Sequence, residues 1–160
     1  MRVFRRFAVL CAMGWWLGGL TLYTTAVIRT AHRVISNHTR VGFVTQAVTA
    51  ELQWIGAGAL ALMLWNAAAS WKAGGNWSRR GLAASWLVAA IAHVALFVLH
   101  ARLDAMLDLS ARQVREGADF HGPHELYELF VGVEWAAGLV YLLSALLAWK
   151  QEDSAGAAAR

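Results

Sequence analysis

The sequence has little of what disulfide-stabilised or loop-rich proteins use. It holds one proline and one cysteine in 160 residues, and charged residues make up only 15%. Because Cys11 has no second cysteine to pair with, an intrachain disulfide is excluded. The 59% of hydrophobic residues and the mean hydropathy of +0.46 are far from the composition of a soluble domain. The composition therefore favours an integral membrane protein.

Four apolar stretches fill most of the chain. A helix needs about 20 apolar residues to cross a bilayer, and four segments meet this requirement: 7–28, 51–71, 81–103 and 127–149. The first is too long for the apolar part of a signal peptide, so we expect an uncleaved span. The sequence predicts an all-α fold, a four-helix transmembrane bundle in a single domain over 1–160.

The ends of two predicted helices can be placed more closely. The second helix should begin near Val41, before its span, because Phe43, Val44 and Ala47 recur at helical spacing. Pro123 should lie in the first turn of the fourth helix, where its missing N–H costs nothing. After that helix, 150–160 is small and polar and is expected to be a short flexible tail.

The basic residues give the expected topology. The amino terminus, the 72–80 loop and the carboxy tail hold eight Lys and Arg, and the two connections on the other side hold six. This bias favours both termini in the cytoplasm and a multi-pass protein of the bacterial inner membrane. The net charge of +4 lies beside apolar segments, so the lipid bilayer is the expected partner and nucleic acid is not.

Small residues predict close helix packing. Gly14 and Gly18 form a GxxxG pair in the first span, a pattern that lets helix backbones approach each other in lipid. The sequence leaves open whether that contact lies within one chain. A homo-oligomer or a larger membrane complex therefore stays open as a partner.

Polar residues gather toward the outer side of the predicted bundle. His93, His100 and Asp104 are seven and four residues apart, so they share one face of the third helix. Tyr127 and Glu134 share a face of the fourth helix, and Glu134 enters to about the depth of His93. We expect His93 and Glu134 to pair if the two faces meet, since a charged carboxylate within a span costs about 3 kcal/mol.

Three interpretations of this cluster, to which His124 also belongs, stay open. The first is a buried polar network that fixes helix packing in an accessory or structural protein. The second is a metal or haem site, for which the candidate ligands are His100, Asp104, His121 and His124. The third is a path for protons or a small solute through His93 and Glu134. No zincin motif, nucleophile elbow or phosphate-binding glycine loop occurs, so a non-enzymatic role without a cofactor is favoured.

An ordered set of short motifs runs along nearly the whole chain. They are Trp16-Leu-Gly-Gly19, Gly42-Phe-Val-Thr-Gln46, Phe97-Val-Leu-His100 with Leu103-Asp104, His124-x-x-Tyr127, and Glu134-Trp135. This set resembles the bacterial, planctomycete-type relatives of the transmembrane-protein-205-like family, a four-span membrane domain of unknown function. The resemblance implies that His100, Asp104, His124 and Tyr127 are family motif positions, and it supplies no activity. Glu134 departs from the polar residue, such as glutamine, expected there in such relatives.

Overall fold

The computed structural model describes residues 1–35, 37–71, 75–108, 113–115, 117 and 119–158. Within these residues, four helical segments are long and apolar enough to cross a membrane, which confirms the predicted four-helix bundle. The first comprises α1 (Arg2–Leu22), the π-helix η1 (Tyr23–Val27) and α2 (Ile28–Val34), and the others are α3 (His38–Ser70), α4 (Asn76–Ala105) and α5 (His121–Ala158).

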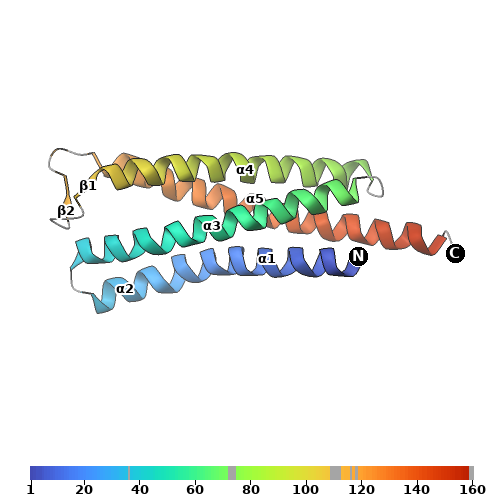
Figure 1. Cartoon of the computed structure of the whole chain (residues 1–160), viewed down its shortest axis with the longest axis horizontal. Coiled ribbons are helices and arrows are strands. Elements are labelled where there is room, and N and C mark those ends of the chain that lie inside the picture. Colours follow the sequence, from blue (N-terminus) through green and yellow to red (C-terminus); the bar gives the residue numbers. More distant parts are fainter. Residues whose placement is uncertain (36, 72–74, 109–112, 116, 118, 159–160) are drawn as a thin grey trace.

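Both chain termini lie at one end of the bundle, called here the termini end (Figure 1). The connection between α2 and α3 lies at the opposite end, together with a short antiparallel hairpin of β1 (Leu107–Asp108) and β2 (Gln113–Val114). We call this the hairpin end. The sequence did not predict the hairpin, because two-residue strands have no detectable alternation of apolar and polar residues.

The helices extend beyond the predicted spans. The 38 residues of α5 measure about 57 Å at 1.5 Å per residue, whereas the apolar bilayer core is about 30 Å thick. Pro123 lies in the first turn of α5, as predicted. Helix α3 begins at His38, before the expected start near Val41, and Asn37 Oδ1 caps it by accepting a hydrogen bond from Arg40 N at 3.2 Å.

The predicted flexible tail is wrong for residues 150–158, which continue α5 and pack against the start of α1. The Arg5 guanidinium donates to both carboxylate oxygens of Glu152, at 2.8 and 2.7 Å, and both side chains are buried. Arg6 reaches Glu152 and Asp153, both at 2.9 Å. These ion pairs connect two ends of the chain that are about 147 residues apart in sequence. The composition of 150–160 alone could not reveal this contact.

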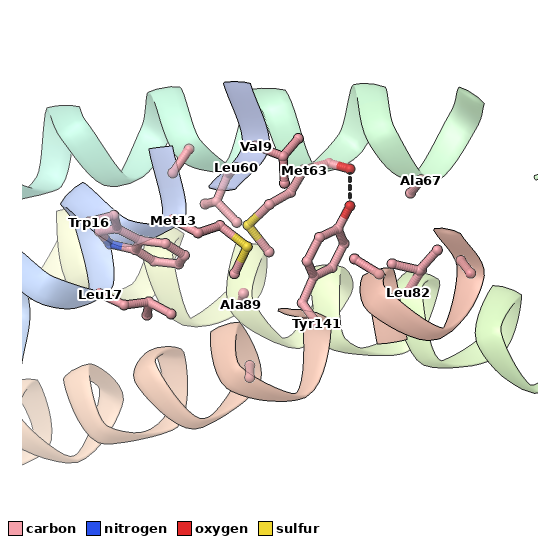
Figure 2. Packing of buried hydrophobic residues seen from close by; sticks show 14 of the residues in the cluster. Val9, Met13, Trp16, Leu17, Leu60, Met63, Ala67, Leu82, Ala89 and Tyr141 are labelled. Carbon is pink, nitrogen blue, oxygen red and sulfur yellow. Dashed lines mark hydrogen bonds between the residues drawn. The ribbon is translucent and has the colours of Figure 1, made fainter. Parts of the chain in front are cut away.

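Close helix packing depends on other glycines than the GxxxG pair. A Cβ atom on Gly138 of α5 would lie 2.8 Å from Leu17 Cδ2 of α1. Gly14 and Gly18, by contrast, are exposed, and a Cβ atom on either would meet nothing within 4 Å. Within the described part of this chain, no other helix therefore packs closely against the faces of Gly14 and Gly18. The core runs between the four helices and includes Met13, Met63 and Tyr141 (Figure 2).

Candidate functional site

A buried ion pair joins α4 to α5. His93 Nδ1 lies 2.5 Å from Glu134 Oε1, and both side chains are almost completely buried. The predicted pairing of these residues is confirmed, and so is the expectation that the two helices turn these faces toward each other. The hydrogen bond needs a proton on Nδ1 or on the Glu134 carboxyl group, and the histidine tautomer decides which of the two donates.

Gly56 of α3 leaves room for the histidine ring. A Cβ atom there would lie 2.8 Å from His93 Cε1 and 2.8 Å from Trp16 Nε1, closer than real Cβ contacts allow. Phe97, one turn along α4, meets the ring edge-on with centroids 5.1 Å apart. Residues from α1, α3 and α4 thus fix the imidazole, while its Nε2 is buried with no hydrogen-bond partner among the described residues.

A second polar group lies nearer the hairpin end. Gln46 Nε2 of α3 donates to Asp104 Oδ1 at 2.7 Å, and His100 Nε2 is 3.5 Å from Asp104 Oδ2. The second distance is longer than a normal N–H···O hydrogen bond. Tyr127 of α5 faces the His100 ring at 6.3 Å and accepts a long hydrogen bond of 3.4 Å from Gln53. Residues of three helices therefore meet around Asp104.

The remaining histidines of the predicted cluster lie on the first turns of α5. His124 Nδ1 is 3.5 Å from Glu128 Oε1, and the ring stacks on Phe120. His121 pairs with Glu125 at 3.0 Å and is exposed. Both histidines are exposed, but His124 lines the cavity described next and His121 does not.

These groups surround one cavity at the hairpin end, which we call the end cavity. Its volume is about 780 Å³, and all four helical segments and both strands contribute to its lining. Five of the six predicted cluster residues line it: His100, Asp104, His124, Tyr127 and Glu134. The sixth, His93, reaches it only through its contact with Glu134.

The π-helix η1 shapes one wall of the end cavity. A π-turn widens the helix by one residue, and such turns recur at functional sites. Tyr23 and Thr24 of η1 line the cavity, and the Tyr23 hydroxyl donates to the backbone oxygen of Thr45 across 3.3 Å. Two threonines that bond back to the preceding turn, Thr24 and Thr25, accompany the local widening.

Sequence reasoning missed part of the α3 wall. Gln46 and Thr49 line the end cavity beside Gln53, and the spacing of three and four residues places all three on one helix face. That spacing was the available signal. Glu51, two residues before Gln53 on the same helix, is exposed and does not line the cavity.

The predicted metal ligands do not come together. Among the residues that the structure describes, no group of three or more His, Cys, Asp or Glu side chains is close enough to hold a metal ion. His100 and Asp104 approach each other, but His121 is exposed and pairs with Glu125. The described side chains therefore form no metal-ligand set.

Below Glu134 the bundle interior is apolar. The next buried polar side chain along α5 is Tyr141, seven residues or about 10 Å farther toward the termini end. Met13, Leu17, Leu60 and Met63 pack in this region (Figure 2). A hydrogen bond spans about 3 Å, which is much less than the distance of about 10 Å between Glu134 and Tyr141. The described side chains therefore offer no continuous polar path through the bundle.

Beyond this apolar layer lies a separate polar network. The Tyr141 hydroxyl donates to Met63 O at 2.5 Å (Figure 2). The same hydroxyl accepts from Asn66 Nδ2 at 3.0 Å. Trp149 Nε1 donates to Asn66 Oδ1 at 3.0 Å. The Tyr141, Asn66 and Trp149 side chains are buried and bonded to one another, so this network joins α3 to α5 and has no free group to offer a ligand.

Comparison with known proteins gave no match: no family model, no curated protein and no solved structure is similar to this chain.

Proposed function

We propose that this chain is a membrane protein that binds a small amphiphilic molecule in the end cavity. One observation supports this most directly: a cavity of about 780 Å³ with polar side chains converging from α3, α4 and α5. Ligand sites are typically about 300–1,000 Å³, mostly apolar, with a few placed polar groups. The end cavity has this composition, since Leu20, Leu52 and Leu96 line it beside Gln46 and Asp104.

The competing interpretations have less support. A structural role for polar residues fits the satisfied network of Tyr141, Asn66 and Trp149, which lies away from the cavity. A proton or solute path requires polar groups across the whole bundle, and the apolar layer around Met13 and Met63 interrupts them. A metal site with three or more His, Cys, Asp or Glu ligands requires groups that the described residues do not bring together.

We further propose that the protein resides in the bacterial inner membrane with both termini in the cytoplasm. Two observations support this: the termini lie at one end of the bundle (Figure 1), and the flanking segments on that side hold most of the Lys and Arg. The end cavity would then face the periplasm. A carboxy-terminal reporter that is active only in the periplasm should stay silent, and an active reporter would reverse this orientation.

The resemblance to transmembrane-protein-205-like relatives remains a proposal. What supports it is that its motif positions His100, Asp104, His124 and Tyr127 all line one cavity. Alignment of a set of such relatives would test it, because a shared site requires that these four positions vary together.

A blocked cavity tests the binding function. Gly42 lines the cavity and Gly58 does not, yet both are exposed glycines of α3 with no atom within 4 Å of an added Cβ. We expect wild type and Gly58→Trp in nanodiscs to bind radiolabelled 1-dodecanol saturably at about one molecule per chain, and Gly42→Trp to show only the linear uptake of the lipid. Equal saturable uptake in Gly42→Trp and Gly58→Trp would rule out binding in the end cavity. The absence of saturable uptake in wild type would rule it out as well.

A further inference from the structure

The charges that line the end cavity are mostly negative. Among the described residues, three carboxylates contribute to the lining, those of Asp104, Glu128 and Glu134, against one guanidinium, that of Arg29. His100 and His124 also line it and lie 3.5 Å from the carboxylates of Asp104 and Glu128. An anionic head group in this space would meet the carboxylates of Asp104 and Glu128, which repel it, whereas a cation would be attracted.

Asp104 is the carboxylate best placed to meet a ligand. Glu134 is occupied by His93, at 2.5 Å, and is nearly inaccessible. Asp104 Oδ1 accepts from Gln46 at 2.7 Å, but the closest described donor to Oδ2 is His100 Nε2 at 3.5 Å. The Asp104 side chain is 41% exposed. Oδ2 therefore has room to accept a shorter hydrogen bond, or to pair with a positive charge, from a molecule in the cavity.

Aromatic rings line the same cavity as Asp104. Tyr127 lies across the His100 ring from α5, and Tyr23, Phe43 and Phe120 contribute further rings to the same lining. Faces of Tyr and Phe rings attract organic cations, and the attraction is strongest where water is excluded. Carboxylate and aromatic groups together favour an ammonium head group over a neutral or anionic one.

We infer that the ligand of the end cavity is an organic cation, an ammonium group on an apolar body, with its charge held beside Asp104. This inference rests on the proposed binding function and specifies the chemical class of the ligand. The ammonium could belong to a free amphiphilic amine or to the head group of an amine-bearing lipid, which present the same chemistry to the cavity.

Three probes with the same apolar chain test the inference: dodecyltrimethylammonium, 1-dodecanol and dodecanoate, each radiolabelled and below its micellar concentration, in nanodiscs of phosphatidylglycerol. The saturable component, defined as the part lost in Gly42→Trp, is compared between probes. We expect the cation to bind at least about tenfold tighter than the alcohol, and dodecanoate to bind weakest.

Substitution of the carboxylate supplies the second arm. Asp104→Asn keeps an oxygen for Gln46 and removes the charge, so it should reduce cation affinity about tenfold and leave dodecanol binding unchanged. Asp119→Asn is the matched control, because Asp119 is exposed and lies outside the cavity lining. Replacing part of the phosphatidylglycerol with phosphatidylethanolamine separates the two sources: competition indicates a lipid amine, and its absence a free amine.

The outcomes separate this inference from the binding function. Saturable dodecanol binding with no preference for the cation, or a preference that persists in Asp104→Asn, would overturn the cation assignment and leave the cavity as a binding site. Failure of all three probes to bind saturably would overturn both.

Discussion

His93 and Glu134 form the most deeply buried ion pair of the described bundle, with 2.5 Å between Nδ1 and Oε1. The pair joins α4 to α5 at the floor of the end cavity, because Glu134 lines the cavity and His93 lies behind it. A buried pair of this kind contributes little net stability when intact, but removing one partner leaves the other without compensation. That asymmetry leads to a direct prediction.

His93→Ala should destabilise the protein by about 3–5 kcal/mol, because Glu134 loses its partner while it stays buried. Glu134→Gln should cost only about 1 kcal/mol, because the amide oxygen can still accept a hydrogen bond from Nδ1–H. Reversible unfolding in mixed micelles, followed by circular dichroism, measures both. His121→Ala, at an exposed position, serves as the control, and a loss in His93→Ala no larger than in this control would contradict the role of the pair.

The glycine beside the histidine ring gives a second prediction. Gly56→Ala should lower the free energy of unfolding by about 1–3 kcal/mol, because the new methyl would lie 2.8 Å from both His93 Cε1 and Trp16 Nε1. Gly58→Ala, two residues along α3, meets nothing within 4 Å and should be neutral or slightly stabilising. Thermal unfolding of the two variants in the same detergent compares them. Equal transition temperatures would show that α1, α3 and α4 are not packed as closely as described.

The sequence predicts the helices and much of the site for different physical reasons. Span length and apolar composition identify the four helices, because the bilayer permits few alternatives. Helical spacing predicts that His93, His100 and Asp104 share a face, and depth predicts the partner of His93. The π-helix η1, the Gly56 contact and the Arg5–Glu152 pair were not predictable, since each depends on which helices become neighbours. Gly14 and Gly18 show the converse, a local packing pattern with no contact inside the described part of this chain.

The network around Tyr141 gives a third prediction. Tyr141→Phe removes the acceptor of Asn66 Nδ2 and the donor to Met63 O, and should cost about 1–2 kcal/mol. Tyr127→Phe loses the 3.4 Å hydrogen bond from Gln53 and the hydroxyl's contact with Thr49, both at the wall of the end cavity, and should cost less than Tyr141→Phe. Chemical unfolding of both variants under identical micelle conditions makes the comparison. A larger loss of stability in Tyr127→Phe than in Tyr141→Phe would contradict this prediction. It would mean that the hydrogen bonds at the hairpin end contribute more to stability than the Tyr141 network.

The contact between the two ends of the chain gives the last prediction. Glu152→Ala leaves Arg5 buried without its partner, so it should destabilise the protein by about 3 kcal/mol and release the end of α5. The released segment should become susceptible to a protease that cleaves after Lys150. Asp153→Ala is the matched control. Asp153 is exposed, and in this variant Arg6 retains its ion pair with Glu152. A helical segment held by Arg5 and Arg6 exposes no extended backbone to a protease. Rapid cleavage of the wild type after Lys150 would therefore show that the end of α5 is not held in this way.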